Sequence, residues 1–211
     1  MDFDINSFLR ELSIAAVPFL MAITVHEASH GYAAYILGDD TAKRAGRLTL
    51  NPLKHLDPLG LLVLFVTRLF GWAKPVPVNF TNLNNKKYGP AIVAGAGPTA
   101  NFITAILSSI IYNIIINLNV SQSLHSTVIV PLALMAFFSI QINIALGIFN
   151  LIPILPLDGG RILQSFLPLN AAYKFSQMEQ YGFVIIIILL LTNVIDRVIF
   201  PVINVLVNFL T

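Results

Sequence analysis

The chain has 211 residues, of which 56% are hydrophobic and only 10% are charged. Soluble domains carry about 25% charged residues, so this chain could not cover a water-exposed surface with polar groups. Its formal net charge of +2 is too small to neutralise a row of phosphates, and the lack of cysteine excludes disulfides, thiolate metal sites and a cysteine nucleophile. These values exclude a water-soluble enzyme, a disordered chain and a nucleic-acid partner, and they predict a polytopic membrane protein in a lipid bilayer.

Four apolar stretches are long enough to cross a bilayer, which takes about 20 mostly apolar residues. They are about Phe8–Leu37, Pro90–Leu118, Val128–Leu151 and Gly182–Leu210. The last of them has Asp, Arg and Pro residues near its middle, so it is either one kinked helix or two shorter segments. A fifth run, Leu59–Trp72, is shorter and contains Arg68, which favours a re-entrant or interfacial segment over a full crossing.

The connection between the first two spans contains short pieces with the composition of β-strands. Gly46–Leu50 and Pro75–Phe80 are the clearest, and Pro, Gly or Asn residues bracket both. Strand backbone at membrane depth is tolerated only where protein or a water-filled cavity covers it. We therefore predict an all-α bundle of about four to six transmembrane helices, with a short membrane-associated β segment and a re-entrant stretch between the first and second full spans.

The basic residues indicate the orientation. If Leu59–Trp72 does not cross, nearly all lysines and arginines of the connecting segments lie on one side of the membrane. The opposite side keeps Arg10 and the loop Asn119–Thr127, which has no Lys or Arg. Because cytoplasmic loops carry an excess of Lys and Arg, we expect the basic side in the cytoplasm and the N-terminus outside.

A metal-binding pattern lies inside the first apolar run, where His26 and Glu27 are followed by His30. Residues four apart on an α-helix lie on one face, one turn apart, so the two imidazoles can hold one Zn²⁺. Glu27 lies beside them, placed to take a proton from an attacking water molecule. A chance match or a pair of hydrogen-bonded core histidines is the alternative. Ionisable groups at membrane depth cost roughly 2.5–3.5 kcal/mol each, however, and are functional by default.

Zinc in hydrolases has three protein ligands and an open position for water, so a third ligand is needed. Asp158 is the best candidate, because two prolines and two glycines in Asn150–Gly160 break the helix around its carboxylate. The alternative is an ordinary turn residue that caps a helix beginning near Arg161. The topology favours the ligand: with Leu59–Trp72 re-entrant, two crossings separate His30 from Asp158, which places both on the cytoplasmic side.

With these residues in hand, the chain resembles the site-2 protease family of intramembrane zinc metalloproteases. The matching stretches follow the family's order and are His26–His30, Asn51–Gly60, Ala73–Val78, Ala96–Asn101 and Asn150–Gly160. The HExxH motif alone is a moderate signal, whereas its pairing in order with an NxxPxxPLDGG element is specific.

The resemblance implies one zinc ion per chain, with His26, His30 and Asp158 as ligands and Glu27 as the general base. It also implies that Asn150 holds the substrate backbone. The strand-like pieces near the site would then present a transmembrane protein or peptide substrate as an added strand.

The resemblance further implies a minimal prokaryotic member without PDZ-like or CBS-like domains. We expect a single intramembrane metalloprotease domain over residues 1–211, with a catalytic core at about 8–165 and a C-terminal hydrophobic hairpin or kinked helix at about 175–211. Such a protein would be multi-pass in the plasma membrane, with its active site toward the cytoplasm.

Several alternatives stay open from the residues themselves. Pro75–Phe80 is the candidate edge for a substrate strand, but it could equally be a cap over the basic loop. Asn101, beside small neighbours, is more easily a helix-packing residue than a catalytic one, and Asp57 more easily a turn residue or a partner of a ligand than a ligand.

Two other functions use the same residues. In a metal or ion transporter, intramembrane His and Asp residues line a path, but such a path needs polar groups spread along several spans, whereas here they cluster at one depth. An inactive homologue that acts as a binding partner would typically lose part of the HExxH or LDGG motif, and both are intact.

Overall fold

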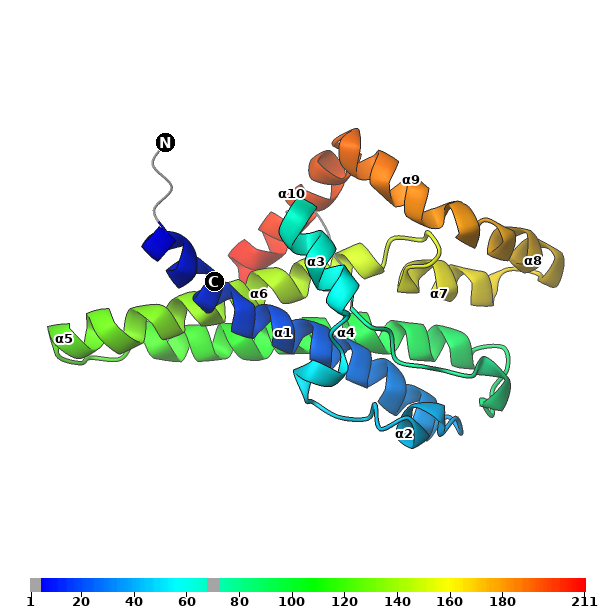
Figure 1. Cartoon of the computed structure of the whole chain (residues 1–211), viewed down its shortest axis with the longest axis horizontal. Coiled ribbons are helices and arrows are strands. Elements are labelled where there is room, and N and C mark those ends of the chain that lie inside the picture. Colours follow the sequence, from blue (N-terminus) through cyan, green and yellow to red (C-terminus); the bar gives the residue numbers. More distant parts are fainter. Residues whose placement is uncertain (1–4, 68–72) are drawn as a thin grey trace.

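The computed structural model describes residues 5–67 and 73–211, and its regular structure is helical (Figure 1). The α-helices among these residues are α1 (Ile5–Ile36), α2 (Thr41–Arg44), α3 (Pro58–Thr67), α4 (Gly89–Ile116), α5 (Gln122–Leu124), α6 (Val130–Asn150), α7 (Asp158–Phe166), α8 (Leu169–Gln177), α9 (Glu179–Leu191) and α10 (Val194–Leu210). Three short helical segments accompany them: η1 (Pro52–Lys54), η2 (Phe80–Asn82) and the π-helical η3 (His125–Ile129). The predicted all-α class is confirmed.

Two helical stretches among the described residues are long and apolar enough to cross a membrane. They are Gly89–Ile116, with 28 residues, and the continuous run Gln122–Asn150, with 29 residues. They correspond to the predicted second and third spans. The pair α8 and α9, bent by 62° at its junction, makes a third if it counts as one span. The described part of the chain thus holds two or three such segments, and the predicted total of four to six is not confirmed.

The last predicted span is two helices. α9 ends at Leu191 and α10 begins at Val194, and between them Asn193 has a φ of 55°, in the left-handed region that Asn tolerates better than most residues. The sequence left open one kinked helix or two shorter segments, and the structure contains two shorter segments. In Figure 1 the two helices meet at an angle rather than forming one rod.

The predicted re-entrant stretch begins with the short helix α3. Its 10 residues rise about 15 Å at 1.5 Å per residue, half of the roughly 30 Å of a bilayer core. A full crossing by α3 alone is thus excluded. The rest of the predicted run, residues 68–72, lies outside the described residues.

The predicted β segment is not confirmed. Within residues 5–67 and 73–211 the structure contains no strand, and one isolated antiparallel bridge joins Leu56 to Ala73. Pro75 and Pro77 have no N–H to donate, and the N–H of Val76 between them donates to Glu27 Oε2 at 2.8 Å. Since this N–H already donates to Glu27, it cannot pair with another strand. Pro75–Phe80 therefore lies beside α1 as an irregular segment.

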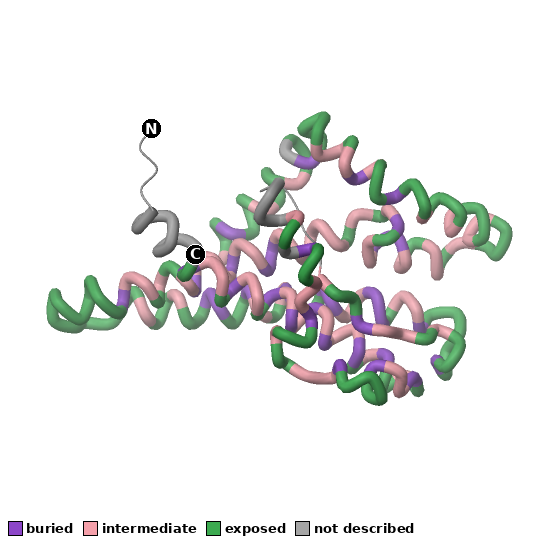
Figure 2. The backbone as a smooth tube through the Cα atoms, in the orientation of Figure 1, coloured by how far each residue is buried: buried purple, intermediate pink, exposed green. Residues whose placement is uncertain are grey.

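The core lies where α1, α4 and α6 pack against one another, and the buried residues gather there (Figure 2). Ala105 of α4 packs on Ile140 and Ile144 of α6, and Val207 of α10 joins this cluster. A small side chain such as Ala105 lets helices approach closely where lipid offers no hydrophobic drive between them. The three helices thereby form a rigid frame for the polar groups on α1.

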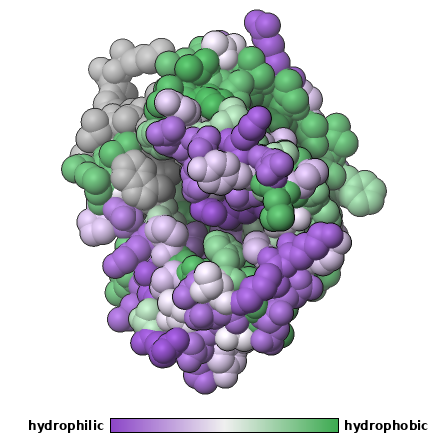
Figure 3. Space-filling view, turned by 90° about the vertical axis from the view of Figure 1, so that its right-hand side faces the viewer, coloured by the Kyte–Doolittle hydropathy of each residue, from purple (hydrophilic) through white to green (hydrophobic). Residues whose placement is uncertain are grey.

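The two ends of the bundle differ in polarity. Helices α2, α7 and α8 and the turn before α4 lie at one end, whereas the turn between α4 and α5 lies at the other (Figure 1). Figure 3 shows the first of these ends, over which hydrophilic side chains gather in the middle and lower parts of the view. This arrangement agrees with the separation of basic segments expected from the sequence.

Asp39 joins the turn after α1 to the segment around η2. It is fully buried, and its carboxylate accepts hydrogen bonds from Thr41 N and Oγ1, from Asn79 N at 2.7 Å and from Asn82 Nδ2 at 2.9 Å. Burial alone would raise the pKa of the Asp39 carboxyl, but these donors outweigh it and hold the pKa below its ordinary value. Asp39 therefore anchors the segment that faces Glu27.

The segment after α6 folds tightly over the first turn of α7, and three glycines permit it. A Cβ at Gly159 would lie 2.2 Å from Leu151 O, and a Cβ at Gly160 would lie 2.5 Å from the carbonyl carbon of Ile154. A Cβ at Gly182, on α9, would lie 1.6 Å from Leu155 O. The backbone thus packs where no side chain fits, and this fixes the position at which α7 begins.

Replacing Gly182 by Ala tests this packing. The methyl group must displace the backbone of Leu155, so we expect Gly182→Ala to lower the thermal unfolding temperature of the protein in detergent. The matched control is Gly95→Ala on α4, whose Cβ would meet only Ile162 at 3.9 Å; since Ala favours a helix over Gly by about 1 kcal/mol, this variant should be unchanged or slightly more stable. Equal unfolding temperatures for the two variants would contradict the proposed close approach.

Candidate metal centre

The two histidines of α1 face the same point. His26 and His30 lie one turn apart, their ring centroids are 4.6 Å apart, and their Nε2 atoms are 3.1 Å apart. Both side chains are nearly buried, with 8% and 12% of their surfaces exposed. The helical spacing in the sequence thus gives the geometry that was predicted from it.

Asp158 completes a triangle with them. Its Oδ2 atom lies 3.2 Å from His26 Nε2 and 3.4 Å from His30 Nε2. Asp158 is the first residue of α7, while the N-cap position is occupied by Leu157. The alternative drawn from the sequence, a capping Asp before a helix near Arg161, is therefore wrong: the helix begins three residues earlier and the carboxylate turns toward α1.

The three atoms fit a zinc ion. Four ligands at about 2.0–2.1 Å around tetrahedral Zn²⁺ lie about 3.3 Å from one another, and the observed edges are 3.1, 3.2 and 3.4 Å. Among the described residues, Asp158 Oδ2 is a buried acceptor without a hydrogen-bond donor. The group of His26, His30 and Asp158 could therefore hold a metal ion.

The other ring nitrogens determine which tautomer is present. His26 Nδ1 lies 2.6 Å from Asn101 Oδ1, and His30 Nδ1 lies 2.7 Å from the carbonyl oxygen of Val93. Because both partners are acceptors, each Nδ1 carries the proton and each Nε2 of a neutral ring presents a lone pair. α4 comes this close because residue 97 is Gly; a Cβ there would lie 2.5 Å from His30 Nε2.

Asn101 does more than the helix packing that the sequence favoured. Its amide is fully buried, and Nδ2 donates to Ala22 O at 3.1 Å and to Asn143 Oδ1 at 2.8 Å. Asn143 in turn donates to Ser139 O at 2.8 Å. This chain of bonds turns Asn101 Oδ1 toward His26. The sequence signal for it was an Asn inside an apolar span, but its partners are 75 and 42 residues away.

Glu27 and Asn150 line the same cavity as the triangle. The cavity has a volume of about 400 Å³, and the segment Pro75–Val78 forms part of its wall beside Glu27. Asn150 is the last residue of α6, and its Nδ2 donates to Leu146 O at 3.0 Å. The structure therefore brings all five predicted site residues to one cavity, while their roles stay predictions.

Asp57 is not part of this cavity. Its Oδ1 accepts hydrogen bonds from Leu59 N at 2.9 Å and from Gly60 N at 3.0 Å, at the start of α3. Asp57 thus has the role of a turn residue that stabilises the helix start, as one of the two interpretations of the sequence expected.

Comparison with known proteins identifies the family. The model of peptidase family M50 matches residues 113–192. A Bacillus subtilis (strain 168) protein named as a zinc metalloprotease, YwhC, is 38% identical over 190 residues, which are 89% of this chain and 84% of that protein. The chain belongs to peptidase family M50, the site-2 protease family. The M50 assignment supports a zinc metalloprotease of the site-2 protease type in a membrane.

More distant relatives carry similar names. The protein Rip2 of Mycolicibacterium smegmatis, also named as a zinc metalloprotease, is 28% identical over 202 residues, which cover 90% of this chain and 71% of Rip2. Rip2 of Mycobacterium tuberculosis (strain H37Rv) is 26% identical over 185 residues, 84% of this chain and 66% of that protein. The solved structures gave no significant match to this M50 chain.

Asn101→Leu tests whether the amide orients the metal ligand. The change leaves His26 Nδ1 and Asn143 without their partner, and loss of such a partner typically weakens metal binding about 10- to 100-fold. Competition between the purified protein and a chromophoric chelator measures the zinc affinity. Asn113→Leu serves as the matched control, because among the described residues its amide donates only within α4, to Ser109 O. Asp158→Ala serves as the reference for a lost ligand. An unchanged affinity in Asn101→Leu would contradict the positioning role.

Proposed function

We propose that the chain is an intramembrane zinc metalloprotease that hydrolyses peptide bonds in transmembrane segments of its substrates, as in regulated intramembrane proteolysis. The observation that carries the proposal is the cavity in which Glu27 lies beside the triangle of His26, His30 and Asp158. A carboxylate next to three metal-ligand atoms in one cavity is the arrangement required for hydrolysis.

Each residue of the site has a separate role in the proposed reaction. His26, His30 and Asp158 would hold the zinc ion, which when bound would polarise a scissile carbonyl and lower the pKa of a water molecule to about 7. Glu27 takes the proton of the attacking water and returns it to the leaving amine. Its Oε2 is held by Val76 N–H, which fixes the carboxylate against the cavity wall and leaves Oε1 for the proton.

The substrate must be partly unwound, because a transmembrane helix hides its carbonyls in hydrogen bonds four residues apart. Backbone partners for the unwound segment are needed from the enzyme. The backbone carbonyl groups of Pro75–Phe80 are our candidates, since the segment lines the cavity beside Glu27 while its Val76 N–H already donates to Glu27. Asn150, on the cavity wall, is our candidate for a side-chain partner of the substrate backbone. An extended peptide bound in this way resembles β-strand addition.

We also propose the setting of the enzyme: a multi-pass protein of the plasma membrane with its site toward the cytoplasm and its N-terminus outside. The gathering of basic segments at one end of the bundle supports this orientation (Figure 1). One domain would cover residues 1–211, with the catalytic core at about 8–165. Two or three segments are long and apolar enough to cross the membrane, and any further span belongs to this proposal. One zinc ion per chain and a transmembrane substrate are also part of it.

A metal or ion transporter is supported less well. The polar chain from His26 through Asn101 and Asn143 reaches Ser139 and Ser108 in the interior. Each of these links is already engaged in a hydrogen bond to the next, whereas a cation path needs oxygen ligands or water molecules that are free to bind the passing ion.

Glu27→Gln tests the assignment of the base. The amide can still accept the bond from Val76 N–H, but it cannot take a proton, and loss of a general base typically costs about 10²–10⁴-fold in rate. We expect the purified variant to retain zinc and to lose cleavage of a membrane-anchored peptide.

The matched control is Asp40→Asn, which also turns a carboxylate into an amide, but at an exposed site paired with Arg44 on α2. It should cleave like the unmodified protein. Cleavage at the full rate by Glu27→Gln would refute the role of Glu27, and failure of the unmodified zinc-loaded protein to cleave any single-span peptide would refute the proposed function.

A further inference from the structure

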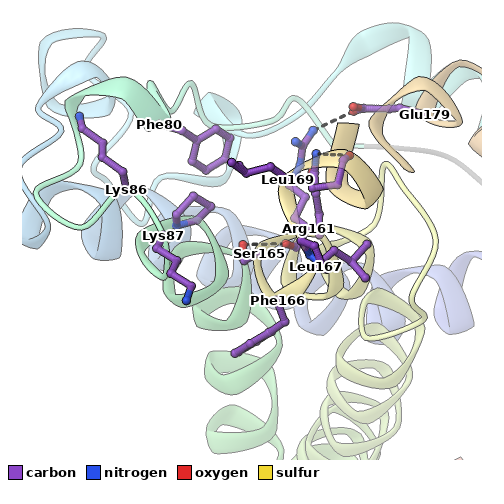
Figure 4. A pocket seen from close by; sticks show the side chains of 13 residues that line it. Phe80, Lys86, Lys87, Arg161, Ser165, Phe166, Leu167, Leu169 and Glu179 are labelled. Carbon is purple, nitrogen blue, oxygen red and sulfur yellow. Dashed lines mark hydrogen bonds and ion pairs between the residues drawn. The ribbon is translucent and has the colours of Figure 1, made fainter. Parts of the chain in front are cut away.

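A second and larger cavity adjoins the candidate active site. Its volume is about 970 Å³, and it lies between the turn that precedes α4 on one side and α7 and α8 on the other (Figure 4). Phe80 and Arg161 line both this cavity and the one that contains Glu27, and the Arg161 guanidinium carbon lies 5.7 Å from the centroid of the Phe80 ring. The two cavities therefore lie side by side and share these two wall residues.

The second cavity carries an excess of positive charge. Lys86, Lys87 and Arg161 line it, against one carboxylate, Glu179, whose Oε1 already pairs with Arg161 Nη2 at 2.9 Å. Lys86 Nζ donates to the carbonyl oxygen of Thr81, and Lys87 Nζ lies 4.9 Å from the ring centroid of Tyr88. Within residues 5–67 and 73–211 neither lysine pairs with a carboxylate, so both charges are available to a ligand.

We propose that this second cavity binds acidic side chains of the substrate. These side chains would belong to the flank of the cleaved span that extends from the active site toward Lys86 and Lys87. The inference rests on the proposed proteolytic function and names its substrate class: membrane segments with Asp or Glu beside the cleaved span. The walls formed by Phe80, Phe166 and Leu169 suit the apolar parts of an extended peptide, while the ammonium groups meet its carboxylates.

One feature favours a polypeptide over an anionic lipid headgroup. The cavity shares the wall residues Phe80 and Arg161 with the active-site cavity, where the proposed function places the substrate backbone. The lysines belong to the polar turn Asn84–Tyr88, ahead of the apolar helix that begins at Gly89. Lipid headgroups also bind basic pockets at this depth, so they form the competing outcome of the test.

The excess of positive charge in the second cavity would disfavour most membrane proteins as substrates. Cytoplasmic flanks of transmembrane segments are usually rich in Lys and Arg, and like charges in a binding cavity disfavour them. A substrate with an acidic flank avoids this repulsion. Specificity would then come from repulsion of basic flanks as well as from binding of acidic ones.

The experiment compares substrates that differ only in flank charge. A single-span peptide series carries one Glu, Gln or Lys, moved stepwise along the flank, and kcat/KM is measured for the unmodified protein and for K86Q/K87Q. Exposed ion pairs are weak, so at the best position, where one Glu meets both lysines, we expect Glu over Gln to be favoured about two- to thirtyfold, and this ratio to approach one in the double variant. K43Q/K54Q removes the same number of charges, two, from exposed positions on α2 and η1 and should keep the ratio.

Charge reversal makes the test specific. In K86E/K87E we expect the order of preference to invert, so that the Lys substrate becomes the better one, and 0.5 M salt should reduce the preference in both proteins because it screens exposed charges. Binding of the same peptides to the cleavage-deficient E27Q variant should show the same order. This binding arm separates a failure of the inference from a failure of the proteolytic function.

Three results would overturn the inference. One is cleavage or binding with the same Glu-to-Gln ratio in the unmodified protein and in K86Q/K87Q. Another is a preference that does not invert in K86E/K87E. The third is an effect of the lysine variants that follows the anionic lipid content of the vesicles and not the peptide charge, which would assign the cavity to a lipid headgroup.

Discussion

Three electron-pair donors converge inside a bundle that is surrounded by lipid, and the rest of the structure depends on this constraint. His26 Nε2, His30 Nε2 and Asp158 Oδ2 lie within 3.4 Å of one another. Without a cation, lone pairs and a negative charge at such distances repel, and in a medium of low dielectric the repulsion is weakly screened. A divalent ion that binds all three converts this unfavourable cluster into a stable one.

Several distant parts of the chain maintain this convergence. α1 provides the two rings on one face, α4 provides the acceptors at Asn101 and Val93 that orient them, and the turn after α6 delivers Asp158. Glycines make the approach possible on both sides, at residue 97 on α4 and at residues 159 and 160 in the first turn of α7. The polar chain through Asn143 satisfies buried amides that would otherwise cost several kcal/mol in an apolar surrounding. The same frame places Glu27 against the Pro75–Phe80 segment, in the cavity that the three donors also line.

Local patterns in the sequence predicted the parts of this structure that depend on local geometry. The spacing of His26 and His30 fixes a helical face, and the prolines and glycines around Asp158 fix a break after an apolar helix. Contacts between distant residues were beyond such patterns: the bond from Asn101 to His26 depends on the packing of α4 on α1. Pro75–Phe80 has strand-like composition, yet its central N–H binds a carboxylate instead of a strand. The alternation of residue types cannot show which acceptor a given N–H will find.

Direct observation of the ion tests the central claim. X-ray absorption at the zinc edge of the purified, zinc-loaded protein reports the number and type of ligand atoms. The proposal predicts one zinc ion per chain in a four-coordinate shell of nitrogen and oxygen atoms at about 2.0–2.1 Å, with scattering from two imidazole rings. A spectrum with at most one imidazole, or a six-coordinate shell at longer distances, would contradict the shared site of His26, His30 and Asp158.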